Sequence, residues 1–175
     1  IEDKEMPQDP VIYSSNLQSG LVIVEPTLRS AVSQEGVINI AAATTLTAGT
    51  HAGRLMRFNV AAGVTATLPA ATGTGNRYRF VVNTTVTSAA DIIAVVGNDS
   101  MFGTVQVSTD GAADLSISFE AGADTDQISM NGTTTGGIAG DYFEVTDIAT
   151  DRWLVWGMIQ ATGTEATPFL TGQVA

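Results

Sequence analysis

The sequence contains no cysteine and a single histidine, His51, so several kinds of chemistry lack the residues they need. Disulfide bridges and thiolate nucleophiles are excluded, and the usual cysteine and histidine ligand sets for zinc cannot be built. His51 lies in the small-residue segment TAGTHAG, and the chain has no G-x-S-x-G turn to present a nucleophilic serine. We therefore expect His51 to be a polar loop residue or a hydrogen-bonding brace. We expect no catalytic residue and no cofactor.

Basic residues are also scarce, because seven lysines and arginines stand against 18 aspartates and glutamates, giving a net charge of −11. A surface this acidic repels polyphosphate, so nucleic acid is not an expected partner. Two neighbouring predicted strands nevertheless gather four arginines, namely Arg54, Arg57, Arg77 and Arg79. These side chains form either a solvated strand face or a local patch for an acidic partner.

Long apolar runs and aromatic residues are few. No apolar run approaches the roughly 20 residues that cross a bilayer, so no membrane partner is expected. Only 6% of the residues are aromatic, which is little for the exposed platform of a sugar cleft. Glu144 and Asp147 would point to opposite faces of a strand, which argues against a glycosidase carboxylate pair there.

The acidic residues include one group that invites comparison with a metal site. Asp124 and Asp126 form a D-x-D pair, and Asp110 and Asp114 lie nearby in the sequence. Oxygen ligands for Ca²⁺ are conceivable there, but the EF-hand spacing is absent. Aspartates in turns that bind their own backbone are the commoner arrangement, so no metal site is assigned.

Short strands bounded by Gly, Asn or Asp are what the sequence has in abundance. Period-2 alternation, frequent Thr and Val, and 18 glycines predict an all-β chain with no sustained helix. The predicted strands lie at 21–25, 37–42, 44–48, 54–60, 64–69, 78–86, 91–97, 101–108, 114–120, 126–132, 141–148 and 152–160. Their spacing predicts a single β-sandwich or jelly-roll-like domain over residues 31–175. No repeat of fixed period is visible, which argues against a solenoid.

Several of these strands allow a prediction of which side chains are buried. In 54–60, Met56, Phe58 and Val60 share one face, and in 64–69 Val64, Ala66 and Leu68 share one face. The segments 141–148 and 152–160 read as a hairpin. Trp153 and Trp156 fall on opposite faces, so at least one of them belongs to the core. The glycine strings at 73–75 and 135–140 read as hairpin and bulge turns, since neither has the lysine and following helix of a phosphate loop.

Residues 1–30 differ from the rest and predict an extended N-terminal arm. Pro7 and Pro10 bias the backbone before them toward extended conformations. Ile12, Tyr13 and Leu17 are candidate anchors by which the arm binds a partner. An unattached terminus is the alternative reading.

Three segments resemble structural proteins of tailed phages. They are TLTAGTHAGRLMRFNVAAGVTATLPAATGTGNRYRFVVNTTVTS at 45–88, NGTTTGGIAGDY at 131–142, and WLVWG with a later GTEATPF between 153 and 169. Together they cover roughly residues 44–170 and are similar to capsid decoration (cement) proteins. The resemblance transfers no catalytic signature.

This resemblance implies a β-rich, homotrimeric virion protein made in the host cytoplasm and carried on the outer capsid surface. Its expected partners are the major capsid protein and further copies of itself. With closed threefold symmetry, the same surface patch would form the contact in every subunit. Assembly would also cover exposed strand edges. The alternatives are a tail-fibre, spike or baseplate β-domain with a receptor- or carbohydrate-binding role, a carbohydrate-binding module, and, third, an enzyme.

Overall fold

The computed structural model describes residues 36–110 and 116–172, which fall within one compact unit beginning at Gly36. The predicted arm, with Ile12, Tyr13 and Leu17, lies outside the described residues. The elements are β1 (Ile38–Ile40), β2 (Thr44–Thr45), α2 (Ala48–His51), β3 (Leu55–Phe58), β4 (Thr65–Thr67), β5 (Arg77–Val82), β6 (Asp91–Ala94), β7 (Ser100–Thr109), β8 (Ser116–Glu120), β9 (Gln127–Met130), β10 (Tyr142–Ala149), β11 (Arg152–Ala161) and β12 (Phe169–Leu170).

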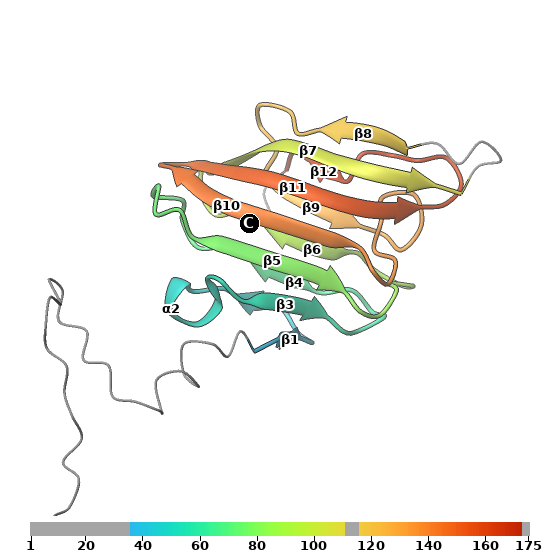
Figure 1. Ribbon diagram of the computed structural model, residues 1–175, viewed down its shortest axis with the longest axis horizontal. Helices are drawn as coiled ribbons and strands as arrows, with labels where there is room; N and C mark the ends of the chain where they lie inside the picture. The colour runs from blue at the N-terminus through green and yellow to red at the C-terminus, as the bar shows by residue number, and fades with distance from the viewer. Residues whose placement is uncertain (1–35, 111–115, 173–175) are drawn as a thin grey trace, which may run out of the picture. The chain divides into compact units, whose positions relative to one another are not determined.

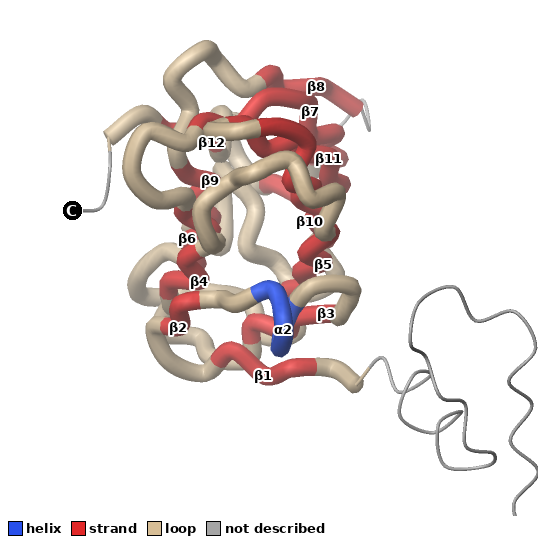
Figure 2. Tube along the Cα trace, turned by 90° about the vertical axis from the view of Figure 1, so that its left-hand side faces the viewer, coloured by secondary structure: helices blue, strands red, loops and turns tan. Residues whose placement is uncertain are grey.

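The strands form two sheets packed face to face. One sheet has seven strands in the order β1-β3-β5-β10-β11-β7-β8, and the other has five in the order β12-β9-β6-β4-β2. Figure 1 views the seven-stranded sheet from its outer side, and Figure 2 shows the two sheets edge-on as separate layers. The predicted all-β, sandwich-like architecture is confirmed.

The first six strands wind between the two sheets as a short coil. Odd-numbered strands β1, β3 and β5 pair in parallel in one sheet, and even-numbered β2, β4 and β6 pair in parallel in the other. This differs from a jelly roll, whose strands are antiparallel. The sequence did not predict the coil because its turns are unequal in length: Ile38 aligns with Met56, and Met56 aligns with Phe80.

The remaining strands complete both sheets. β10 and β11 form the predicted antiparallel hairpin, and its turn places Asp151 at a positive φ of 58°. β11 also pairs in parallel with β7 along its full length. In the five-stranded sheet, β9 pairs antiparallel with both β6 and β12. None of the described helices is long and apolar enough to cross a bilayer.

One predicted strand is largely wrong. The segment 44–48 forms a strand only at Thr44–Thr45, and the chain then turns into the four-residue helix α2. The Thr47 amide donates a hydrogen bond to His51 Nδ1 at 3.0 Å, which stabilises the turn against the extended backbone. A side chain four residues away thus overrides the local alternation.

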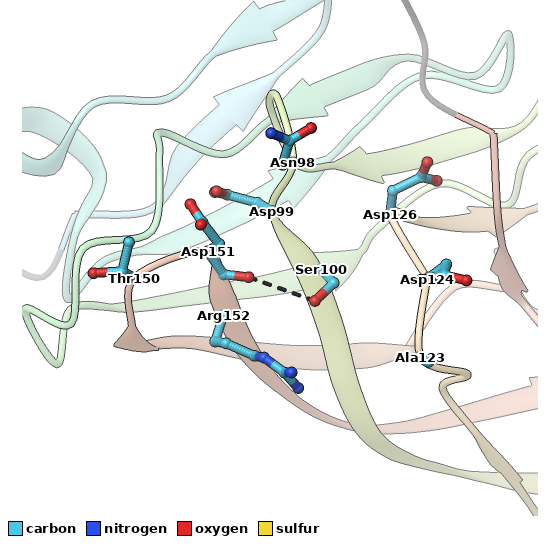
Figure 3. A pocket seen from close by; sticks show the side chains of 9 residues that line it. All are labelled: Asn98, Asp99, Ser100, Ala123, Asp124, Asp126, Thr150, Asp151 and Arg152. Atoms are coloured by element: carbon cyan, nitrogen blue, oxygen red, sulfur yellow. Dashed lines mark hydrogen bonds between the residues drawn. The ribbon is translucent and has the colours of Figure 1, made fainter.

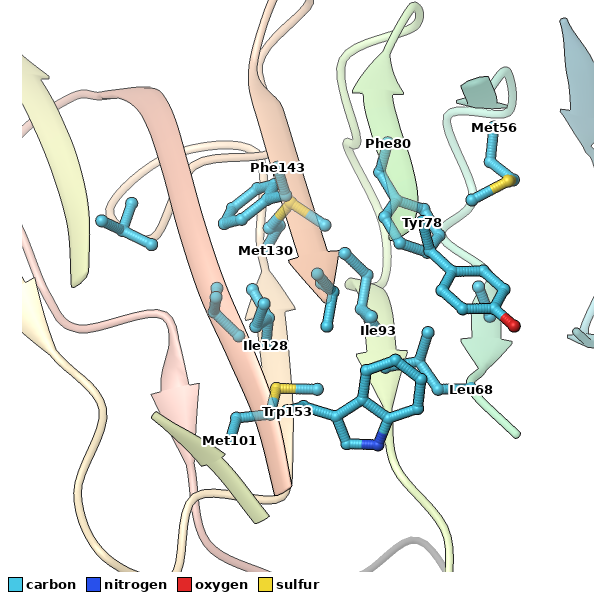
Figure 4. Close-up of a cluster of buried hydrophobic side chains, with 14 of the residues drawn as sticks. Met56, Leu68, Tyr78, Phe80, Ile93, Met101, Ile128, Met130, Phe143 and Trp153 are labelled. Atoms are coloured by element: carbon cyan, nitrogen blue, oxygen red, sulfur yellow. The ribbon is translucent and has the colours of Figure 1, made fainter. Parts of the chain in front are cut away.

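The core lies between the sheets and confirms most of the predicted burial pattern, although Val60 and Val64 are only partly buried. Met56 and Phe58 are fully buried on β3, as are Ala66 and Leu68 at β4. Trp153 has no exposed surface, whereas Trp156 is 49% exposed on the opposite face of β11. Figure 4 shows large side chains from both sheets meeting, including Met56, Tyr78, Phe80, Phe143, Met101 and Trp153 from one and Ile93, Ile128 and Met130 from the other.

Candidate interaction surface

The glycine-rich turn at 71–76 is held by a buried carboxylate. Asp147, on β10, accepts hydrogen bonds from the backbone amides of Thr72, Gly73 and Thr74 at 3.0, 2.6 and 3.0 Å. The Thr74 hydroxyl donates a further bond at 2.6 Å. Burial by itself would raise the pKa of Asp147, but these hydrogen bonds outweigh it and lower the pKa. Amides that could bind an external anion are therefore occupied by the chain's own aspartate.

The segment 131–142 is organised in the same way. Asp141 accepts hydrogen bonds from the amides of Gly137, Ile138 and Gln160 at 2.8, 3.0 and 2.8 Å. Burial raises the pKa of this carboxyl despite those bonds. The Asn131 side chain accepts bonds from the Thr133 amide and hydroxyl at 2.9 and 3.1 Å. These hydrogen bonds therefore hold the motif in its loop conformation.

The acidic group singled out in the sequence is not gathered into one site. Asp126 accepts bonds from the Gly172 amide, and Asp110 accepts one from the Gly163 amide at 3.2 Å. Asp124 is exposed, and Asp114 lies outside the described residues. Within residues 36–110 and 116–172, no three His, Cys, Asp or Glu side chains are arranged to hold a metal ion.

A polar pocket of about 530 Å³ lies at the end of the sandwich where the β10–β11 turn meets β7. Its lining includes four aspartates and one arginine, shown in Figure 3 with their neighbours: Asn98, Asp99, Ser100, Ala123, Asp124, Asp126, Thr150, Asp151 and Arg152. Asp99 has a structural role, because its Oδ2 accepts bonds from the Ala71 amide at 2.7 Å and the Trp153 indole at 3.1 Å. The pocket is acidic and contains no aromatic side chain.

The outer face of the seven-stranded sheet carries an exposed apolar row. Leu154, Trp156 and Met158 project outward from β11 and are 40%, 49% and 55% exposed. Tyr142 on β10 aligns with Met158, and its ring meets the Trp156 ring edge-on at 6.0 Å. Ile148, further along β10, is also exposed. We call these five residues the outer stripe.

Arginines flank the outer stripe. The described residues contain five basic side chains, all arginines, and four of these point outward from this sheet: Arg57, Arg77, Arg79 and Arg152. Arg77 lies 3.8 Å from Glu144, the outward glutamate of β10. The predicted clustering of arginines on two adjacent strands is confirmed, since β3 and β5 pair directly.

The outer stripe is the feature that sequence reasoning missed. On β11 the alternation of apolar and polar residues fails, because WLVWGMI is apolar on both faces. From the sequence, this run predicts an ordinary strand with at least one core tryptophan. The continuous apolar run was the available signal, since one face of an outer sheet normally carries polar residues.

No protein-family model matches the chain, and searches of curated proteins and of solved structures found no significant match.

Proposed function

We propose that this chain is a structural virion protein that binds the outer surface of a tailed-phage capsid and stabilises it. The observation that carries the proposal is the outer stripe, an exposed apolar row that suits the contact between copies in a homotrimeric virion protein. Contiguous exposed apolar surface of this kind is typical of protein–protein contacts. The resemblance of residues 45–88, 131–142 and 153–169 to capsid decoration proteins supports the same role.

The chemistry of the loops is compatible with this function. Asp147 and Asp141 fix the two glycine-rich segments to the sheet, which suits a particle surface that must resist unfolding and proteolysis. We propose the major capsid protein and further copies of the chain, as a homotrimer, as partners. The segment 1–30 remains the predicted capsid-binding arm, with Ile12, Tyr13 and Leu17 as its anchors.

The proposal is tested by measuring occupancy on purified particles that lack the protein and are then given it back. We expect saturable binding at hundreds of copies per particle and a higher temperature of particle disruption. Particles that neither bind the full chain nor gain stability would contradict the function.

The arm is tested separately in the same assay. Replacing Ile12, Tyr13 and Leu17 together by serine should reduce occupancy at least tenfold, because apolar anchors dominate such contacts. The matched control replaces Ser14, Ser15 and Gln18 by alanine and should bind normally. Equal occupancy for both variants would remove the arm from the contact.

The second candidate is a tail-fibre, spike or baseplate domain with a receptor- or carbohydrate-binding role. The polar pocket at the sandwich end is the observation that favours it, since glycans are bound by converging polar side chains. Against it, the Tyr142 and Trp156 rings meet at 66° and do not form a flat platform for a sugar ring. A copy number of tens or fewer per particle, with a saturable glycan isotherm, would favour this candidate.

A further inference from the structure

The outer face of the seven-stranded sheet has the composition of a contact surface. Tryptophan, tyrosine, methionine and arginine are the residue types enriched at protein interfaces, and here they lie together. Trp156, Met158 and Tyr142 come from two adjacent strands, so the apolar surface is continuous. Arg79 on β5 aligns with Glu144 on β10, which places the basic side chains directly beside that surface.

The face is also electrically different from the chain as a whole. Its strands present four arginines and two glutamates, Glu120 and Glu144, to the outside. The whole chain carries −11. A locally positive face on a strongly negative molecule attracts negative surfaces, and the nearest source of such surfaces is another copy of the same chain.

The size of the face suits a stable contact. Seven strands about 4.8 Å apart span roughly 29 Å, and the ten residues of β11 extend about 33 Å. The face therefore offers at most roughly 960 Å², the same order as the ~800 Å² that each partner buries in a standard interface.

We propose that this outer face is the surface through which one copy of the chain packs against the next. The inference rests on the homotrimer of the proposed function and identifies which side of the sandwich forms it. The outer stripe becomes buried, and the arginines on β3 and β5 face an acidic surface of the neighbouring copy. The acidic surface that the outer face contacts is a different part of the neighbouring copy, so the contact is heterologous, joining two different surfaces. A heterologous contact repeated by threefold rotation closes into a ring.

Sedimentation velocity of the full-length chain, from 1 to 100 µM and at 0.05 and 0.5 M NaCl, tests the proposal. The wild type should sediment as a closed assembly, with weaker association at high salt because screening acts on the arginine contacts. Trp156→Ser and Met158→Ser should each raise the dissociation constant at least tenfold, since both remove apolar surface from the centre of the contact. Arg57→Glu should weaken association most at low salt.

Leu170→Ser is the matched control. Leu170 is an apolar side chain, 44% exposed, on β12 of the other sheet, and its loss should leave assembly unchanged. If a serine variant fails to fold, Met158→Lys provides a second disruption at a position that is 55% exposed. A wild type that stays monomeric at 100 µM, or an assembly indifferent to the stripe variants, would overturn the proposal.

Fluorescence quenching by acrylamide gives a readout that needs no variant. Trp153 is buried in the core, so quenching in the assembled wild type reports on Trp156. Both tryptophans should be shielded if the stripe is covered, and an accessible tryptophan in the assembled species would contradict the contact.

The outcomes also separate this inference from the proposed function. Capsid binding by a monomeric chain would contradict the proposed interface and support the proposed function. Assembly through the outer stripe without any capsid binding would support the interface and contradict the function.

Discussion

At the scale of single residues, buried aspartates shape this domain. Five of them are buried in the described residues, and each accepts a hydrogen bond from a backbone amide: Asp91, Asp99, Asp126, Asp141 and Asp147. A buried carboxylate is costly unless such donors surround it. These side chains therefore hold loops and strand ends in place from inside the domain. Part of the acidic composition thus has a structural role in addition to its contribution to surface charge.

Asp147→Asn should destabilise the domain by about 2 kcal/mol. The asparagine NH₂ group would face amide donors of the 72–74 turn, which leaves at least one of them without an acceptor. Urea unfolding at pH 7 measures the change. Asp124→Asn is the control, because Asp124 is exposed, and its unfolding midpoint should match the wild type. Equal midpoints for both variants would show that the turn is held by other contacts.

Local patterns in the sequence were enough to predict the orientation of some of these buried residues. The position of Asp147 on the face opposite Glu144 followed from strand alternation. The glycine strings were correctly predicted to form turns. The carboxylate–amide contacts could not be predicted, because Asp147 and Thr72 are 75 residues apart. Such pairs depend on strand order, which alternation does not encode.

At the scale of elements, strand existence was predictable and strand partners were not. The alternation at 54–60 located β3 and separated its buried face from its outer face. The apolar run at 152–160 located β11 but did not identify which of its faces is buried. Neither pattern specifies whether a neighbour is parallel. A two-residue turn implies an antiparallel hairpin, as for β10 and β11, whereas the longer connections of β1 to β6 permit the parallel coil.

Gly103 is a sharp test of the parallel pairing of β7 with β11. Its φ is +131°, and a Cβ there would lie 1.9 Å from the Val155 carbonyl oxygen. Gly103→Ala should therefore cost at least about 3 kcal/mol or prevent folding, because backbone atoms would have to move.

The control is Gly49→Ala, on the short helix α2. No atom lies within 4 Å of the position its Cβ would occupy, so the change should alter stability by less than about 1 kcal/mol. Thermal unfolding followed by circular dichroism compares the two variants. A stable Gly103→Ala protein would contradict the β7–β11 register.

At the scale of the whole molecule, charge is unevenly divided. Most arginines of the described residues lie on the outer face of one sheet, while four aspartates line the pocket at one end. The net charge follows from the composition alone. The arginine cluster was predicted from its position on two neighbouring strands, which are β3 and β5. The outer stripe beside the arginine cluster depends on strand order, because the fold places β10 and β11 next to β5 at the centre of the sheet.

Stability should also depend on pH through buried carboxylates whose pKa is raised by burial. Asp91 has no exposed surface, and its Oδ1 accepts a bond from the Val64 amide at 3.0 Å. Its Oδ2 has no hydrogen-bond partner among the described residues. Burial raises the pKa of Asp91 to about 6, against 3.8 for a free aspartate, although the Val64 amide opposes the shift. The folded state therefore favours the protonated form.

A raised carboxyl pKa stabilises the fold fully below the unfolded value and loses that contribution as pH rises through the folded value. Between about pH 4 and 7 the wild type should therefore lose up to about 3 kcal/mol from Asp91, with Asp141 acting in the same direction. Asp147 acts oppositely, since its lowered pKa costs stability only when the pH falls below about 4. Asp91→Asn cannot ionise, so its urea-unfolding free energy should fall less over this window than that of the wild type at the same chain concentration. Two curves that stay parallel from pH 4 to 7 would mean that Asp91 is already ionised in the fold, with water or a neighbouring donor at its second oxygen.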